Sequence, residues 1–235
     1  MDLTQRIEHA DWTAVTESLN DKGYATVSKI LSADECDALI SQYGDDTRYR
    51  KTIQMENHGY GMGQYKYYNY PLPGTVQQLR ELIYPNIAPV ANNWMKALGI
   101  EKTFPGTLNE LTEQCHAHGQ TRPTPLILKY GKSGYNAMHQ DLYGEIFFPM
   151  QLVVCLNEPG TDFTGGEFVL VEQRPRMQSK AMVLNPGKGD MLIFTTNFRP
   201  VKGTKGYYRV NMRHGVSELS SGERHTLGVI FHDAS

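Results

Sequence analysis

A histidine and an aspartate stand two residues apart at His139 and Asp141, and another histidine, His214, lies in a later strand-like segment. Side chains two residues apart on an extended strand leave the same face, so the first pair can bind one metal ion. Two imidazoles and one carboxylate occupy one face of an octahedral ion and leave positions free for a cosubstrate, oxygen or water. A closed structural zinc site has no such free position. If the fold brings His214 to the pair, the three residues predict a non-haem iron(II) centre.

The C-terminal half has the short strands that would position these ligands. Runs rich in β-branched or apolar residues alternate with turn signals such as Gly165-Gly166 and Asn185-Pro186-Gly187. This spacing predicts an antiparallel jelly roll, with the ligands near strand ends at one mouth. The predicted strands are Leu126–Tyr130, Gln151–Asn157, Glu167–Val171, Ala181–Leu184, Met191–Thr195, Arg209–His214 and Arg224–Phe231.

Helices are predicted in the N-terminal half, where they would brace the sheet. Ser32 and Glu35 have the spacing of a capping box at the start of a helix over Ala33–Tyr43. An amphipathic, core-packing role is the default for such helices. Further helices are predicted after an Asp11 cap through Leu19, and from Thr75 to Leu98 with interruptions near Pro85 and Pro89.

Length and composition indicate one compact domain. The 235 residues can bury a substantial core, and no linker or repeat marks a boundary, so 1–235 is predicted as a single domain. Within it, 1–125 would be helical support and a substrate lid, and 126–235 the catalytic jelly roll. No run of about eighteen apolar residues and no signal-peptide pattern is present, which favours a cytoplasmic protein without membrane attachment. Three widely spaced cysteines do not suggest a secreted disulfide framework.

Motifs in a fixed order carry a family resemblance over the C-terminal half. They are Tyr130-Gly131, His139-Gln140-Asp141, Gly165-Gly166-Glu167, Gly189-Asp190, His214-Gly215-Val216 and Gly222-Glu223-Arg224. This series resembles the 2-oxoglutarate and iron(II)-dependent oxygenases. The resemblance implies a mainly β fold with flanking helices, whose core is a double-stranded β-helix (jelly roll). It also implies Fe(II), 2-oxoglutarate and O2 as cofactors and co-reactant, with ascorbate as a candidate reductant.

The resemblance assigns roles to individual residues. His139, Asp141 and His214 would hold iron and be essential for catalysis. Arg224, ten positions after His214, would pair with the distal carboxylate of 2-oxoglutarate, a task that suits the planar fork of arginine. Tyr130 would hydrogen-bond the cosubstrate. Thr226 shares the strand face of Arg224 and is a further candidate for the pocket.

A tyrosine-rich segment in the N-terminal half is a candidate for substrate binding. Residues 60–70 include five tyrosines and two glycines, and Arg48, Arg50 and Lys51 precede them. Aromatic faces with nearby cations can stack on unpaired bases and hold phosphates, so the segment could be a nucleotide-recognition lid. A strand that merely covers the barrel would use the same tyrosines. The candidate contacts here are Tyr65, Tyr67 and Tyr68.

A second candidate segment is cationic and precedes the distal histidine. It contains Arg199, Lys202, Lys205, Arg209 and Arg213, which could follow a nucleic-acid backbone. Most charge runs are simply solvated, and the formal net charge of -2 gives nucleic acid no global electrostatic support. Arg199, Lys202 and Arg209 are retained as candidates.

The resemblance points to two classes of substrate. The His-Gln-Asp motif after a tyrosine-containing strand is similar to the AlkB group, which dealkylates nucleic-acid bases, and the whole chain resembles a bacterial oxygenase family proposed to act on nucleic acids. The AlkB pattern has an acidic residue where this chain has Tyr143, itself a candidate substrate contact, and a second arginine that is missing after Arg224. The spacing from His214 to Arg224 is closer to prolyl-hydroxylase-type enzymes.

Three functions follow from these patterns. The favoured one is a dioxygenase that hydroxylates or oxidatively dealkylates modified bases in single-stranded or alkylated DNA or RNA, as in DNA alkylation repair. The second is a hydroxylase of a protein side chain or small metabolite. The third is a noncatalytic, cupin-like metal-binding module, and the oligomeric state is left open.

The other histidines are not expected to bind the metal. His116 and His118 resemble a ligand pair, but their surroundings predict a solvated loop. His225 faces away from Arg224 on the predicted strand, and His232 at its end is read as structural or exposed.

Overall fold

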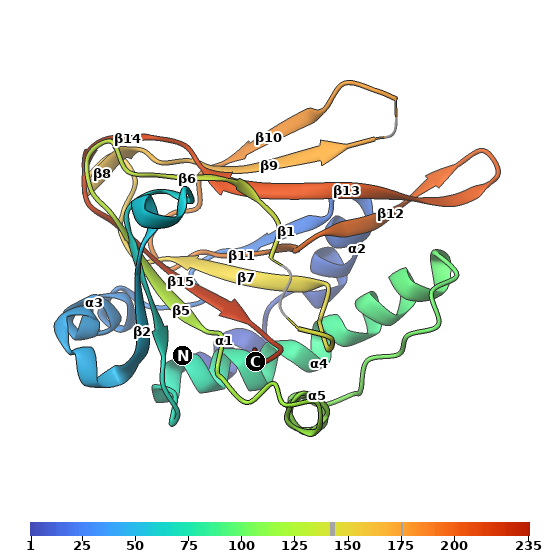
Figure 1. Cartoon of the computed structure of the whole chain (residues 1–235), viewed down its shortest axis with the longest axis horizontal. Helices are drawn as coiled ribbons and strands as arrows, with labels where there is room; N and C mark the ends of the chain where they lie inside the picture. Colours follow the sequence, from blue (N-terminus) through green and yellow to red (C-terminus); the bar gives the residue numbers. More distant parts are fainter. Residues whose placement is uncertain (142–143, 175) are drawn as a thin grey trace.

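The protein is described by a computed structural model that covers residues 1–141, 144–174 and 176–235. Two antiparallel sheets form its centre (Figure 1). The seven-stranded sheet has the order β1 (Tyr24–Val27), β11 (Met191–Thr195), β7 (Met150–Cys155), β15 (Arg224–Ile230), β5 (Leu126–Tyr130), β4 (Gln64–Tyr68) and β2 (Tyr49–Gln54). The second sheet has the order β10 (Lys180–Leu184), β9 (Phe168–Gln173), β13 (Gly206–Val216), β6 (Tyr135–His139) and β3 (Gly61–Met62), and β12 (Phe198–Gly203) pairs with β13.

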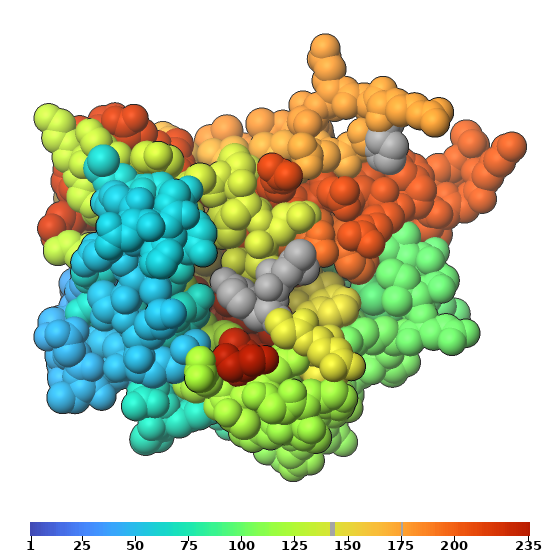
Figure 2. Space-filling model, in the orientation of Figure 1, coloured from blue at the N-terminus to red at the C-terminus, as the bar shows by residue number. Residues whose placement is uncertain are grey.

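The predicted fold class is confirmed. Each of the seven predicted strands is present with small shifts at its ends, and all pairings between strands of the two sheets are antiparallel. A short pair, β8 (Phe163–Gly165) and β14 (Leu219–Gly222), stands apart from both sheets. The β9–β10 and β12–β13 hairpins project from the body of the molecule (Figure 2).

Helices lie along one side of the seven-stranded sheet, as Figure 1 shows for α4. They are α1 (Leu3–Glu8), α2 (Trp12–Lys22), α3 (Ala33–Ser41), α4 (Gly74–Ala97) and α5 (Leu108–Ala117). The capping box of Ser32 and Glu35 is present at the start of α3. Short 3-10 turns, η1 (Gln42–Gly44), η2 (Asp46–Arg48) and η3 (Met55–His58), flank β2. None of the described helices is both long and apolar enough to cross a membrane.

The N-terminal half adds strands to its predicted helices. β1 lies at one edge of the seven-stranded sheet, and β4 and β2 lie at the other. The tyrosine-rich segment therefore includes strand β4, which pairs with β5 of the jelly roll along Tyr67↔Leu126 to Gln64↔Lys129. The register of this pairing determines which tyrosines of β4 face each side of the sheet.

The predicted interruption of the long helix was wrong. α4 runs from Gly74 to Ala97 with Pro85 and Pro89 inside it. Each proline removes one backbone hydrogen bond, but the helix face that includes Ile83, Ile87 and Ala91 is fully buried. Tertiary packing of this face outweighs the local cost of the prolines.

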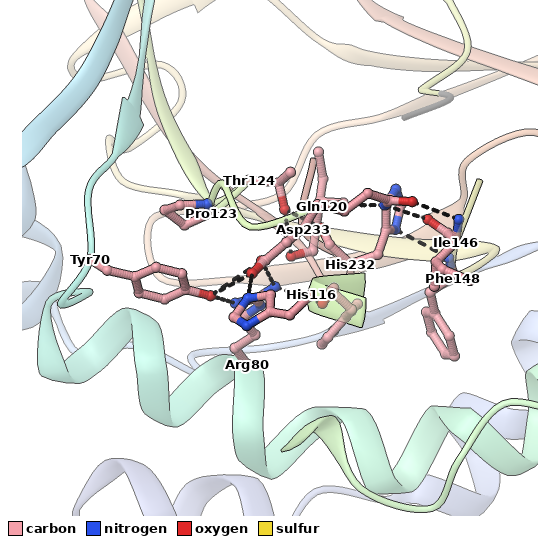
Figure 3. A network of polar contacts seen from close by, with 12 residues as sticks. Tyr70, Arg80, His116, Gln120, Pro123, Thr124, Ile146, Phe148, His232 and Asp233 are labelled. Carbon is pink, nitrogen blue, oxygen red and sulfur yellow. Dashed lines mark hydrogen bonds and ion pairs between the residues drawn. The ribbon is translucent and has the colours of Figure 1, made fainter. Parts of the chain in front are cut away.

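A buried polar network joins α4 and α5 to the end of the chain (Figure 3). The Arg80 guanidinium donates to Asp233 Oδ1 at 2.6 Å, and both side chains are almost completely buried. The prediction that His116 lies in a loop was wrong, because it occupies the last turn of α5 and its Nε2 is 3.0 Å from Asp233 Oδ2. Gln120 anchors Ile146, five residues after Asp141, since it donates to Ile146 O and accepts from Ile146 N.

Candidate active site

The fold brings the three predicted metal ligands together. β6 and β13 are neighbours, and His139 is the direct partner of His214 across the two strands. Asp141 follows β6 by two residues, and donor atoms of all three side chains lie within 4.8 Å of one another. Asp141 Oδ2 is 3.2 Å from His214 Nε2, and Asp141 Oδ1 is 3.5 Å from His139 Nε2. Two imidazole nitrogens and one carboxylate on one side of a site fit Fe(II).

Hydrogen bonds and burial prepare these groups as ligands. His139 Nδ1 lies 2.7 Å from Ala137 O, which favours a proton on Nδ1 and leaves the Nε2 lone pair for a metal. Burial lowers the pKa of His139, and the neighbouring His214 lowers it further. Burial acts to raise the pKa of Asp141, but His214, His139 and the Gln151 hydrogen bond together outweigh it, and the pKa lies well below its usual range. A neutral imidazole and an ionised carboxylate are the forms that bind metal.

Two glutamines that the sequence analysis did not select support the ligands. Gln140 donates to Asn197 Oδ1 at 2.7 Å and to Met212 O at 2.8 Å, which fastens the turn between the first two ligands to β13. Gln151 donates to Asp141 Oδ2 at 2.6 Å, and its Nε2 is 3.2 Å from His214 Nε2. Gln151 is the one polar residue in the otherwise apolar strand β7, and this exception in the sequence could have indicated a functional role.

Replacing Gln151 with leucine is expected to weaken metal binding by about tenfold to a hundredfold, the usual cost of losing a partner of a metal ligand. The leucine would fill similar space but leave Asp141 Oδ2 without its 2.6 Å donor. Anaerobic titration with Mn(II), followed by calorimetry, measures the effect directly. The control is Gln173→Leu at the end of β9, and an unchanged Mn(II) affinity in Gln151→Leu would contradict the role.

A cavity of about 530 Å³ joins the triad to the seven-stranded sheet. Arg224 and Thr226 line it because they occupy alternate positions on β15, and Tyr130 lines it opposite Arg224 on β5. Arg224 is only 2% exposed, and its Nη1 donates to Thr226 Oγ1 at 2.6 Å. Among the described residues no carboxylate pairs with this guanidinium, and its Nε has no hydrogen-bond partner. A buried cation of this kind needs an anionic ligand.

Tyr130 contributes a second unused polar group to the same cavity. Its hydroxyl is buried and forms no hydrogen bond of normal geometry with a described residue, although the Asn136 side chain lies close enough to lower its pKa. Burial raises the pKa of Tyr130 to about 12, although Arg224 partly offsets this, so the hydroxyl keeps its proton at neutral pH and can donate. The guanidinium and the hydroxyl donors of Thr226 and Tyr130 fit a carboxylate such as that of 2-oxoglutarate.

The structure separates the three candidate tyrosines of β4. Tyr65 and Tyr67 point to one face and line the cavity, where their rings pack edge to face with centroids 5.5 Å apart. Tyr68 points to the opposite face and lies fully buried in the core, with its ring centroid 5.0 Å from that of Tyr49. The prediction that Tyr68 contacts substrate was therefore wrong, because adjacent residues of a strand face opposite sides.

The cationic candidates before His214 do not reach the cavity. Arg199 is buried and its Nη2 lies 2.6 Å from Glu172 Oε2, so its predicted contact with substrate was wrong. Lys202 and Arg209 are exposed on the β12–β13 hairpin, and neither is among the described residues that line the cavity. The Arg209 guanidinium covers the Phe198 ring at 4.2 Å. Tyr143 lies outside the described residues.

The last two histidines are both buried and lie outside the triad. His225 has its backbone N–H bonded to Asn157 Oδ1 at 2.6 Å, and its ring packs edge to face against Tyr43. His232 accepts a hydrogen bond from Phe148 N through its Nδ1 at 3.1 Å, within the network of Figure 3. Neither is among the residues that could hold the metal, as predicted for His225, and His232 takes the structural alternative of its prediction.

The burial of His225 predicts a loss of stability in acid. Burial, assisted by Lys129, lowers the pKa of His225 to about 4, whereas an unfolded histidine has a pKa of about 6.5. The unfolded chain therefore takes up the proton first, and the contribution is complete above about pH 6.5 and is lost as the pH falls toward 4. The upper limit of this loss is about 3 kcal/mol. Urea unfolding at pH 7 and pH 5 should show a smaller difference for His225→Phe than for the unmodified protein, and equal differences would contradict the prediction.

The triad, the buried Arg224 and the antiparallel sheets are those of a non-haem iron oxygenase that uses 2-oxoglutarate. A prolyl-4-hydroxylase from Pseudomonas putida is similar in structure, with 14% identity and a TM-score of 0.55 over 95% of this chain and 100% of that one. An oxidoreductase of the 2OG-Fe(II) oxygenase family from Burkholderia pseudomallei has 15% identity and a TM-score of 0.54 over 97% and 94%. At these identities the likeness concerns the fold.

The chain belongs to the Oxygenase-NA family. Residues 63–234 match this family, which is described as "Oxygenase, catalysing oxidative methylation of damaged DNA". Two Mycobacterium tuberculosis proteins, "Uncharacterized protein MT2286" of strain CDC 1551 / Oshkosh and "Uncharacterized protein Rv2227" of strain ATCC 25618 / H37Rv, are each 48% identical over 165 residues, which is 70% of this chain and 71% of theirs. Family membership and the triad make the protein an enzyme, as the motifs predicted, and not a noncatalytic metal-binding module.

Proposed function

We propose that this oxygenase hydroxylates or dealkylates an alkylated base in single-stranded DNA or RNA. The observation that carries the proposal is the position of Tyr65 and Tyr67 on the wall of the cavity that holds the triad. The Arg50 guanidinium lies 4.5 Å from the Tyr67 ring centroid, so a cation packs against this aromatic ring. Aromatic faces backed by arginine suit unpaired bases, which stack on them regardless of sequence. The description of the family, which names damaged DNA, supports the same class of substrate.

The proposal gives each part of the cavity a task. His139, Asp141 and His214 hold Fe(II), and Arg224 holds the distal carboxylate of 2-oxoglutarate with help from Thr226 and Tyr130. Bound together, the metal and cosubstrate supply the oxidation of a C–H bond by O2, with release of succinate and carbon dioxide. When the oxidised carbon is attached to nitrogen, the hydroxylated group leaves and the base is restored.

The protein's own contribution is positioning and shielding. His139 has a side chain that is 35% exposed, whereas those of Asp141 and His214 are 12% and 7% exposed, so the metal site is reached from the His139 side. Apolar residues, including Leu128, Leu152 and Phe168, cover the inner wall. They keep water from the reacting carbon, while the polar donors fix the cosubstrate.

The proposal is tested by titrating the anaerobic Fe(II) protein with 2-oxoglutarate and then adding oxygen. Succinate is measured with an N-methylated single-stranded oligonucleotide, with its unmethylated counterpart and with a proline-containing peptide. We expect succinate formation to be stimulated by the methylated strand alone, together with loss of the methyl group. Stimulation by the peptide but not by the strand would contradict the proposal and favour a hydroxylase of protein side chains.

A further inference from the structure

A second, cationic cleft of about 310 Å³ adjoins the active-site cavity. Three of the residues that line it carry a positive charge, and none of its described lining residues is acidic. They are Arg50, Lys51, Asn69, Tyr70, Thr121, Arg122 and Pro123. The whole chain has a formal net charge of -2, so this cleft is a local concentration of positive charge and not part of a generally basic surface.

The cleft and the cavity share a wall. Lys51 lines both of them. Arg50 lines the cleft, and its guanidinium lies 4.5 Å from the ring centroid of Tyr67, which lines the cavity. One extended ligand can therefore place an aromatic group against Tyr67 and an adjacent anionic group in the cleft.

The local structure of β2 explains why two consecutive cations serve one cleft. In a regular strand, Arg50 and Lys51 would point to opposite faces. The pairing of β2 with β4 is irregular between Tyr49 and Lys51, and an irregularity of this kind redirects a side chain. β2 is also the last strand of the seven-stranded sheet, so no further strand covers its outer side.

The walls of the cleft are held rigidly before any ligand binds. Tyr70 receives a hydrogen bond from Arg80 at 2.8 Å and donates to Asp233 at 2.9 Å within the buried network (Figure 3). Arg122 exchanges two backbone hydrogen bonds of 2.9 Å with Ala234, and Arg50 Nε donates to Pro123 O at 2.8 Å. Binding would therefore require little ordering of this surface.

Resting on the proposed function, we propose that this cleft binds the backbone phosphates next to the target base of a single nucleic-acid strand. Lys51 and Arg122 are exposed, and neither forms an ion pair with a described residue. Their charges are available to phosphate oxygens, which are the anions that alternate with bases along a strand. The cations that contact the backbone are thus those of β2 and of the segment before β5.

The test compares Lys51→Gln/Arg122→Gln with the control Lys22→Gln/Lys96→Gln, which removes the same charge from exposed helix positions away from both pockets. Arg50 is left in place because it packs on Tyr67. Fluorescence anisotropy measures the affinity for a labelled single strand at several salt concentrations. We expect Lys51→Gln/Arg122→Gln to lose about tenfold or more in affinity for the strand. The slope of log affinity against log salt concentration should become shallower by about 1.4, which is about 0.7 for each lost phosphate contact. The control should keep the affinity within about twofold of the unmodified protein and leave the salt dependence unchanged.

The outcomes separate this inference from the proposed function. Equal affinity and salt dependence in both variants would overturn the phosphate site even if the unmodified protein demethylates the strand. Weakened binding in Lys51→Gln/Arg122→Gln, with neither succinate formation nor base modification by the unmodified protein on the methylated strand, would support the site and contradict the proposed function. Equal competition by an acidic peptide of the same charge would overturn the assignment to nucleic acid, as would failure of the unmodified protein to bind the strand.

Discussion

Asp141→Ala is expected to abolish succinate formation and to weaken metal binding by more than about a hundredfold. The loss exceeds that for a residue that only supports a ligand, which is about tenfold to a hundredfold, because the carboxylate itself is removed. It also removes the negative charge beside two imidazoles whose ring centroids lie 4.2 Å apart. Mn(II) titration and a 2-oxoglutarate turnover assay measure the two effects independently.

The matched control for this variant is Asp21→Ala, an exposed aspartate near the end of α2. It should keep full activity and metal affinity. Asp141→Asn separates charge from shape, since the amide keeps the size of the side chain but is a poorer ligand. Iron-dependent succinate formation in Asp141→Ala at the level of the unmodified protein would show that Asp141 is not a ligand.

Arg224→Met is expected to lower the affinity for 2-oxoglutarate by about a hundredfold or more while leaving Mn(II) binding intact. Removal of one partner from a buried, hydrogen-bonded charge pair costs about 2 to 5 kcal/mol, and each 1.4 kcal/mol is about tenfold in affinity. The same substitution should raise the stability of the ligand-free protein by on the order of 1 to 3 kcal/mol, because the buried guanidinium has no carboxylate partner among the described residues. Opposite signs for binding and stability are typical of a residue retained for function.

Calorimetry with 2-oxoglutarate in the presence of Mn(II), together with urea unfolding, tests both signs. The control is Lys132→Met, which removes an exposed cation just after β5 and should change neither quantity by more than about twofold in affinity or 0.5 kcal/mol in stability. A destabilised Arg224→Met protein with unchanged 2-oxoglutarate affinity would mean that the arginine is a structural residue.

The residues that face the substrate could be predicted only in part from the sequence, because residues that cluster in a pattern do not all face the same cavity. The tyrosines of 60–70 were recognisable as a group, but the group divides, with Tyr65 and Tyr67 in the cavity and Tyr68 in the core. The cations before His214 cluster in the sequence, yet Arg199 forms a buried ion pair with Glu172 and does not face the cavity. The cleft cations Lys51 and Arg122 are 71 positions apart, and that distance along the chain hides their proximity.

The strands, the antiparallel class and the members of the triad could all be predicted from local patterns of residues. These properties depend on short-range patterns: alternation with period two, glycine and proline at turns, and two ligands on one strand face. The presence of Arg224 beside the triad could also be predicted, because its position ten residues after His214 belongs to an ordered series of motifs.

The neighbours of those residues from distant parts of the chain became known from the folded structure. Pairing of β6 with β13 brings His214 to His139, and Gln151 reaches Asp141 from a third strand. α4 continues through two prolines because a buried face holds it against the sheet. Sheet register and packing depend on contacts between residues far apart in the chain, and no local pattern specifies the partner of a given side chain.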